Sequence, residues 1–381
     1  PGPSDVHPHV LKAMATPLLG HLDPVFLNMM NETMDLIRYV YQTDNQVTIA
    51  MSGTGSAGME TIFVNLVEPG DKVIIGVNGL FGQRMVDVAQ RAGAEVIQVE
   101  AEWGKIIEPA SFEKALKEHA PVKAVAVVHA ETSTGVQQPL KELSRLAKEY
   151  DALFMVDAVT SLGGMKVGVD EIGMDAVYSG TQKCLSAPPG LAPVSLSDKA
   201  TEVLNKRKTK VQSWYLDLSM IQAYWGKERF YHHTAPISMV YALHEALRLI
   251  KEEGLEETFK RHELNGRALQ TGLEAMGLEL FAQEAHRLPM LTSVRVPEGV
   301  EDAKVRKLLL ERYGIEIGGG LGPTKGQIWR VGLMGYSSQR SNVLQFLSAL
   351  GSILREAGAD IDAGQGIQAA ETYFQTRNTE G

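Results

Sequence analysis

The chain has 381 residues, and 37 basic residues against 46 acidic ones give it a formal net charge of −9. An acidic balance of this size argues against a general nucleic-acid-binding protein. Cys184 is the only cysteine, which excludes an intramolecular disulfide framework and the Cys-rich zinc and iron–sulfur sites. A single cysteine also fits a reducing compartment, so we expect a cytoplasmic protein.

The sequence contains no recognisable membrane span or targeting signal. A spanning helix needs ~20 mostly apolar residues, whereas an apolar run such as 122–128 is strand-length and interrupted by Lys123. The first four residues lack the basic region and apolar stretch of a signal peptide, and the last three match no peroxisomal or retention tripeptide. We therefore expect no membrane partner.

Short apolar runs alternate with longer amphipathic stretches over the first 200 residues. This alternation predicts an α/β fold whose large domain contains a mostly parallel, seven-stranded sheet covered on both faces. Such sheets bind ligands beyond the carboxyl ends of their strands. The predicted strands are 47–51, 72–77, 95–99, 124–128, 153–156, 176–178 and 192–196, and the helices between them include 58–66, 83–91 and 140–150.

The pattern changes near Pro236, where two long helical stretches begin and a strand–helix–strand–helix sequence follows. This predicts a smaller C-terminal α+β domain, built from helices 238–252, 255–276, 302–313 and 337–356 with strands 291–296 and 327–331. The predicted limits are an N-terminal arm at 1–20, a large domain at 21–255 and a small domain at 256–381. The tail after Ala357 is polar, so we expect it to be loosely held.

A glycine-rich turn, Gly53-Thr54-Gly55-Ser56, follows the first strand and opens a helix. With Gly58 it matches a dinucleotide-binding pattern, but the next strand ends at 77–78 without the carboxylate that a ribose hydroxyl needs. What remains is a cup of backbone N–H groups and hydroxyls for a phosphate. A glycine-rich turn without a ligand is the alternative.

Two further residues follow buried strands at the same predicted edge of the sheet. Asp157 ends an apolar strand, where a carboxylate is costly unless it is paired; it either caps a helix or binds a cationic group of a ligand. Lys183 follows the strand 176–178, and lysines are more often solvated surface charges. Together, a phosphate cup, a carboxylate and an amine match the needs of pyridoxal phosphate (PLP): phosphate, ring nitrogen and aldehyde respectively.

At this point the chain resembles the class V, fold-type I PLP aminotransferases, and within them the alanine–glyoxylate (serine–pyruvate) branch. The resemblance covers residues 1 to about 356. The motifs that carry it are Ser52-Gly53-Thr54-Gly55, Asn78-Gly79-Leu80-Phe81-Gly82-Gln83-Arg84, Ser133-Thr134-Gly135-Val136, Val156-Asp157-Ala158-Val159, Ser179-Gly180-Thr181-Gln182-Lys183, Tyr231-His232-His233-Thr234 and Gly318-Gly319-Gly320-Leu321-Gly322.

The resemblance implies a role for each matching residue. Lys183 is implied as the catalytic lysine that binds the cofactor covalently and moves the substrate's Cα proton, and Asp157 as the partner of the ring nitrogen. Val159 and Phe81 are implied as packing on the two ring faces, and Thr132 as lying near the ring hydroxyl. The remaining implied cofactor contacts go to the phosphate: Thr54, Gly55, Ser56 and Gln182, with Tyr231 and Thr234 reaching it from the neighbouring subunit of a homodimer.

Arg330 lies in a predicted small-domain strand, on the face opposite Trp329 and Val331. The guanidinium fork suits a bidentate carboxylate, and the resemblance implies that Arg330 binds the substrate's α-carboxylate. A structural ion pair is the alternative.

The activity implied is transfer of the amino group of alanine to glyoxylate in a ping-pong cycle that gives pyruvate and glycine. Serine–glyoxylate and ureidoglycine–glyoxylate aminotransferases are the alternatives within the family, and a non-catalytic subunit is the alternative outside it. Cysteine desulfurases are excluded because their nucleophilic cysteine lies on a distal loop, whereas Cys184 adjoins Lys183. We expect no metal at His232-His233, since no acidic or cysteine cluster completes a site, and we interpret the basic run 206–210 as a solvated face.

Overall fold

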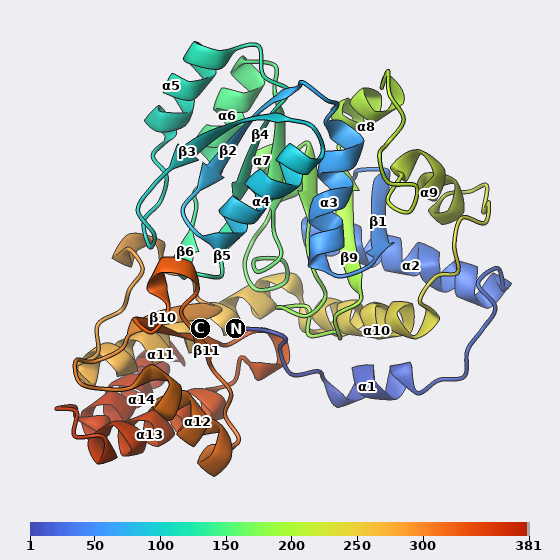
Figure 1. Cartoon of the computed structure of the whole chain (residues 1–381). Helices are drawn as coiled ribbons and strands as arrows, with labels where there is room; N and C mark the ends of the chain where they lie inside the picture. Colours follow the sequence, from blue (N-terminus) through green and yellow to red (C-terminus); the bar gives the residue numbers. More distant parts are fainter. Residues whose placement is uncertain (379–381) are drawn as a thin grey trace.

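The structure is a computed structural model that describes residues 1–378. Its larger part contains a seven-stranded sheet of order β1-β9-β8-β7-β4-β2-β3 (Figure 1). Only β9 is antiparallel to its two neighbours, so the predicted mostly parallel, seven-stranded sheet is confirmed. Its strands are β1 (Val47–Ser52), β2 (Lys72–Val77), β3 (Glu95–Glu100), β4 (Ala124–Val128), β7 (Leu153–Asp157), β8 (Ala176–Tyr178) and β9 (Leu191–Leu196).

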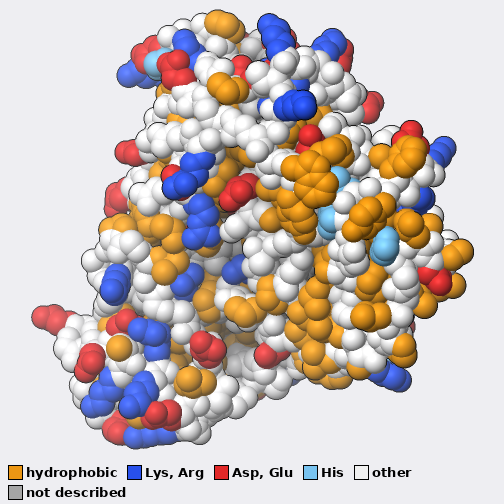
Figure 2. All heavy atoms as spheres, turned by 45° about the vertical axis from the view of Figure 1, so that its right-hand side comes forward, with side chains coloured by type: hydrophobic (Ala, Val, Ile, Leu, Met, Phe, Trp, Pro, Cys, Tyr) orange, Lys and Arg blue, Asp and Glu red, His pale blue; other side chains and the backbone are white. Residues whose placement is uncertain are grey.

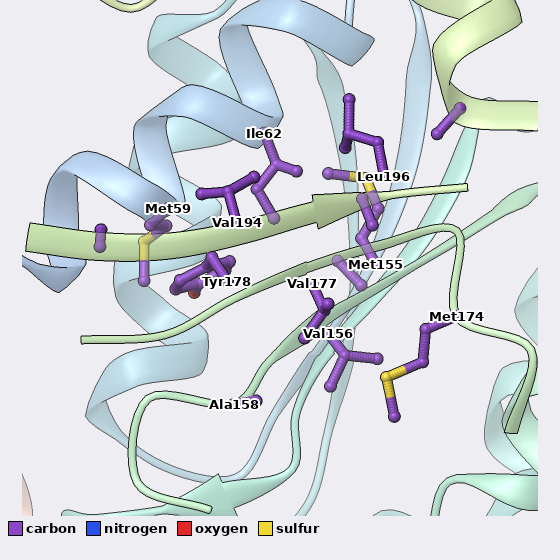
Figure 3. Close-up of a cluster of buried hydrophobic side chains, with 14 of the residues drawn as sticks. Met59, Ile62, Met155, Val156, Ala158, Met174, Val177, Tyr178, Val194 and Leu196 are labelled. Atoms are coloured by element: carbon purple, nitrogen blue, oxygen red, sulfur yellow. The ribbon is translucent and has the colours of Figure 1, made fainter. Parts of the chain in front are cut away.

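Helices cover the sheet, which explains why its inner strands read as continuous apolar runs. In Figure 1, α3 (Gly55–Leu66) and α4 (Leu80–Arg91) lie side by side in front of the strands. α3 packs mainly on β8 and β9, and Met59 and Ile62 of this helix meet Tyr178 and Val194 of the sheet (Figure 3). The other helices of this part are α2 (Pro24–Tyr41), α5 (Pro109–His119), α6 (Lys141–Glu149), α7 (Val169–Ile172), α8 (Asp198–Asn205), α9 (Leu218–Trp225) and α10 (Ile237–Glu253).

A second hydrophobic core lies toward the C-terminus, between a small antiparallel sheet and four helices. The sheet has the order β10-β12-β11. Its elements are β10 (Leu291–Arg295), β11 (Gly318–Gly319), β12 (Ile328–Gly332), α11 (Leu255–Ala275), α12 (Asp302–Tyr313), α13 (Arg340–Glu356) and α14 (Ala363–Asn378). The division into an N-terminal arm and two domains, with its residue limits, stays a prediction.

The predicted loose tail after Ala357 is wrong as far as residue 378. α14 packs on α11 and α13 and buries Ala370 and Phe374 in the second core. The apolar residues Ala363, Ile367, Ala370 and Phe374 recur at helical spacing, a signal that the polar residues between them obscured. The last three residues of the predicted tail lie outside the described range.

The N-terminal segment crosses from one part of the molecule to the other. α1 (Pro8–Met14) packs on α10, and the Ser4 N–H donates to the Gln182 carbonyl over 2.8 Å. The first residues therefore lie beside the turn that carries Lys183. The remaining short elements are β5 (Ala130–Glu131), β6 (Val136–Gln137) and the 3-10 turns Glu284–His286, Gly322–Thr324 and Gly335–Ser337. Within residues 1–378, no helix has both the length and the apolar character needed to cross a bilayer.

Candidate active site

A cavity of about 210 Å³ opens where β4, β7 and β8 end, beside the first turn of α3. Parallel sheets bind their ligands at this edge. The cavity is lined by every predicted cofactor residue except Tyr231 and Thr234: Thr54, Gly55, Ser56, Phe81, Thr132, Asp157, Val159, Gln182 and Lys183. Its wall is completed by residues that were not predicted as site residues: Met59, Arg84, Val128, Ala130 and Tyr178.

The glycine-rich turn and Gln182 form one end of the cavity. Only two residues separate β1 from α3, and one of them, Gly53, has a φ of 135°, which L side chains rarely adopt. The first N–H groups of a helix have no partner within the helix, and the helix dipole favours an anion there. The side-chain amide of Gln182 also lines this end, and its N–H2 group can donate to an anion. This end of the cavity is therefore chemically suited to a phosphate.

Asp157 also lines the cavity, and both of its carboxylate oxygens accept hydrogen bonds. Oδ1 accepts from the Val159 N–H over 2.8 Å, and Oδ2 accepts from the Tyr178 hydroxyl over 2.6 Å. Burial raises the pKa of Asp157 to about 6, while the hydrogen bond from Tyr178 acts in the opposite direction. No helix begins at Asp157, so the helix-cap alternative is not what the structure shows.

Lys183 is 8% exposed and is enclosed by the N-terminal segment. Its Nζ donates to the Pro1 carbonyl over 2.6 Å. A Cβ at Gly2 would lie 2.6 Å from Nζ, and the Ser4 hydroxyl donates to the Lys183 carbonyl over 2.7 Å. Burial, and next the positive charge of Arg330, lower the pKa of Lys183 to about 8. The amine is thus far closer to its neutral, nucleophilic form than a surface lysine.

Glu131, which was not predicted, connects two loops of the site. Its carboxylate is fully buried and accepts from the N–H of Phe81 over 3.1 Å and from the Ser133 hydroxyl over 2.6 Å. It thereby fixes the first turn of α4, which carries Phe81, to the loop that carries Thr132. Burial raises the pKa of Glu131. A buried carboxylate after an apolar strand was the available sequence signal, the same signal that identified Asp157.

Arg330 lies near this cavity but lines an adjoining one, together with residues 1–5. Trp329 and Val331 pack in the second core, whereas Arg330 points toward the large part and donates to the carbonyls of Gly319 (2.8 Å) and Thr132 (3.3 Å). Within residues 1–378 its guanidinium forms no salt bridge, so the predicted alternative, a structural ion pair, has no acidic partner there. Its charge remains available to a ligand.

Tyr231 and Thr234 are the predicted cofactor residues that this chain does not bring to the cavity. Tyr231 is 58% exposed, and its hydroxyl lies 3.3 Å from that of Thr234. Their predicted contact with the phosphate of a neighbouring subunit stays a prediction.

Cys184 lies behind the cavity, where it packs with Met290 and Met334. Its Sγ donates to the Thr160 carbonyl over 3.3 Å. Burial raises the pKa of the thiol to about 12, so the sulfur stays protonated and is no nucleophile at neutral pH.

A mostly parallel sheet with an anion cup, a buried carboxylate and an enclosed lysine at one edge defines the architecture of a PLP enzyme. Comparison with known proteins agrees: residues 12–346 match the aminotransferase class-V family, and the chain belongs to it. It is 40% identical to alanine–glyoxylate aminotransferase of Drosophila melanogaster over 94% of this chain and 92% of that protein.

Two solved structures are also similar. Ureidoglycine–glyoxylate aminotransferase from Bacillus subtilis has 43% identity and a TM-score of 0.96, covering 98% of this chain and 96% of that one. Alanine–glyoxylate aminotransferase from Nostoc sp. has 49% identity and a TM-score of 0.91, covering 93% and 94% respectively. The protein is therefore a PLP-dependent transaminase of the alanine–glyoxylate/ureidoglycine–glyoxylate type.

The residues present fit PLP. The cup beside α3 and the side-chain N–H2 group of Gln182 supply hydrogen-bond donors at the end suited to a phosphate. Asp157 offers a carboxylate for the ring nitrogen, and Lys183 offers an amine of lowered pKa for the aldehyde. All of these groups line one cavity.

The lowered pKa of Lys183 predicts a pH dependence of cofactor capture. Only the neutral amine attacks an aldehyde, and its fraction rises with pH through about 8 rather than ~10.4, as for a free lysine. The rate at which the apo-protein takes up PLP, followed by stopped-flow absorbance, should therefore rise with a midpoint near pH 8. Arg330→Gln removes a positive charge and should move the midpoint upward. A midpoint near 10 in the native protein would contradict this reading.

Proposed function

We propose that the protein transfers the amino group of alanine to glyoxylate, giving pyruvate and glycine. The observation that carries the choice of a small donor is the close packing around Lys183 and Arg330. A Cβ at Gly2 would collide with Lys183 Nζ, and one at Gly318 would lie 2.7 Å from the Pro1 ring and 3.0 Å from the Arg330 guanidinium. The N-terminal residues therefore pack directly against Lys183 and Arg330, and this packing favours a donor with a short side chain. The 40% and 49% identities to alanine–glyoxylate aminotransferases support the same choice.

When bound, PLP supplies an electron sink for negative charge at the substrate's Cα. In our proposal Thr54, Gly55, Ser56 and Gln182 bind its phosphate, Asp157 keeps a proton on its ring nitrogen, and Val159 and Phe81 pack on its faces. Thr132 lies near the ring hydroxyl. These assignments rest on the lining of the cavity and on the hydrogen bonds of Asp157.

Lys183 and Arg330 act on the substrate in this proposal. Arg330 binds the α-carboxylate with its guanidinium fork, which orients Cα toward Lys183. The Lys183 amine, neutral above about pH 8, takes the proton from Cα and returns a proton during the same half-reaction, as general base and then acid. The N-terminal segment over Lys183 limits the access of water to this amine.

We also propose a homodimer in which Tyr231 and Thr234 complete the partner's phosphate site. An exposed aromatic surface supports it: Trp214, Tyr215, Phe230 and Tyr231 are 61%, 44%, 66% and 58% exposed. Figure 2 shows hydrophobic and histidine side chains gathered on one side of the molecule. Contiguous apolar surface of this kind marks an interaction site. A cytoplasmic location, suggested by the single cysteine, stays part of the proposal.

Ureidoglycine is the second candidate donor, because the ureidoglycine–glyoxylate enzyme of Bacillus subtilis superposes with a TM-score of 0.96. Serine remains the third. A ureido group is larger and more polar than a methyl group, and the close walls at Gly2 and Gly318 disfavour it.

A donor panel separates these candidates. With glyoxylate as acceptor, kcat/KM for alanine should exceed that for serine, aspartate and (S)-ureidoglycine, by about tenfold or more for the bulkier donors. The readout is glycine formed under initial-rate conditions. A kcat/KM for ureidoglycine above that for alanine would overturn the proposed donor while leaving the transaminase assignment intact.

A further inference from the structure

Asp157 and Tyr178 form a hydrogen-bonded pair in the wall of the cavity. They lie opposite one another in the register of β7 and β8, and the Tyr178 hydroxyl donates to Asp157 Oδ2 over 2.6 Å. Tyr178 is 1% exposed and Asp157 is 3% exposed, so water cannot readily replace the hydroxyl. The Tyr178 ring packs below α3 near Met59 (Figure 3).

We propose that Tyr178 is a positioning residue that keeps Asp157 ionised and aimed at the cofactor's ring nitrogen. This rests on the proposed role of Asp157. The hydroxyl donates to one carboxylate oxygen and the Val159 N–H to the other. With both oxygens held, the carboxyl plane cannot rotate freely, and two donors favour the charged form.

The electrostatic surroundings explain why this donor matters. Burial raises the pKa of Asp157 to about 6, and the Tyr178 hydrogen bond is the largest influence that opposes burial. The Val159 N–H, Lys183 and Arg84 also lower the pKa of Asp157. Five ionisable groups on the surrounding elements interact electrostatically with Asp157. They are Tyr41 on α2, Arg84 on α4, Glu131 on β5, Tyr178 on β8 and Lys183 in the turn after β8.

Losing the hydroxyl has a definite consequence. In Tyr178→Phe the ring still fills its place below α3, but Oδ2 loses its donor. The pKa of Asp157 should then rise above about 6, because the loss of this donor removes the largest influence that opposes burial, and a larger fraction of the carboxyl groups carries a proton at pH 7. A neutral Asp157 cannot keep a positive charge on the ring nitrogen, and proton removal from the substrate's Cα becomes slower.

The structure offers a matched control in Tyr41. This tyrosine is also buried and interacts electrostatically with Asp157, but its hydroxyl donates to the Pro193 carbonyl over 2.9 Å. Tyr41→Phe therefore removes the same atom from a similarly buried position without removing a hydrogen bond to the carboxylate.

The test is a pH titration of the apo-protein labelled with ¹³C at the aspartate carboxyl carbons, with the Asp157 signal assigned by its loss in Asp157→Asn. We expect a midpoint near 6 in the native protein and a rise of about one pH unit or more in Tyr178→Phe, with no comparable rise in Tyr41→Phe. In the loaded enzyme, kcat with alanine should fall about tenfold or more in Tyr178→Phe only.

Site-specific 3-fluorotyrosine at position 178 keeps the shape and makes the phenol a stronger donor, so it should lower the Asp157 midpoint even if the Phe variant folds poorly. An unchanged midpoint in both position-178 variants, or an equal rise in Tyr41→Phe, would overturn the proposal. The titration needs no substrate, so its failure is distinguishable from failure of the alanine–glyoxylate assignment in the donor panel.

Discussion

Replacing Lys183 with alanine is expected to abolish transamination with every donor, lowering kcat by about 10³-fold or more. Among residues 1–378, Lys183 is the only lysine that lines the cavity. The variant therefore loses both the covalent attachment of the cofactor and the group that moves the Cα proton. Cofactor absorbance in the purified protein and initial rates with alanine and glyoxylate measure the two losses separately.

Lys307→Ala is the matched control for this change. Lys307 lies on α12 with its side chain 70% exposed, so its loss should leave kcat within the error of the assay. A Lys183→Ala protein that folds and retains normal turnover would remove Lys183 from the mechanism.

Asp157→Asn should have the next largest effect, a fall in kcat of about 10²- to 10³-fold. The amide keeps the shape of the carboxyl group but carries no charge, so it cannot keep a proton on the ring nitrogen. The amide oxygen can still accept from the Val159 N–H, while the Tyr178 hydroxyl, which now donates to Oδ2, must instead accept from the amide N–H2 group. Rates should be compared at saturating alanine, with bound cofactor quantified in each preparation. A kcat within twofold of the native value would contradict the role assigned to Asp157.

Much of the larger part of the fold could be predicted from the sequence, because buried parallel strands read as apolar runs. The helix starts were predicted less well. The predicted start of α3 was residue 58, whereas the helix begins at Gly55. The prediction was three residues late because the sequence Gly55-Ser56-Ala57 resembles a loop when the helix dipole and the ligand are not considered. α14 was missed because its apolar residues are few and spread among polar ones.

The residues of the candidate site could likewise be predicted only in part. Lys183, Asp157 and the glycine-rich turn each follow a strand, so chain position alone places them at one edge of the sheet. Tyr178 and Glu131 were missed because their roles depend on strand register and on a hydrogen bond between loops, neither of which a local pattern contains. The nearness of Arg330 to Thr132 depends on how the two cores pack together, and the roles of Tyr231 and Thr234 depend on a second copy of the chain.

The most direct test of the central claim is to locate the covalent attachment of the cofactor. The purified protein, loaded with PLP, is reduced with borohydride, digested and analysed by peptide mass spectrometry. We expect the mass of the reduced cofactor on the peptide that contains Lys183, at one equivalent per chain, and no such mass in the Lys183→Ala protein. Attachment at a different lysine, or a Lys183→Ala protein that carries the same modification, would contradict it.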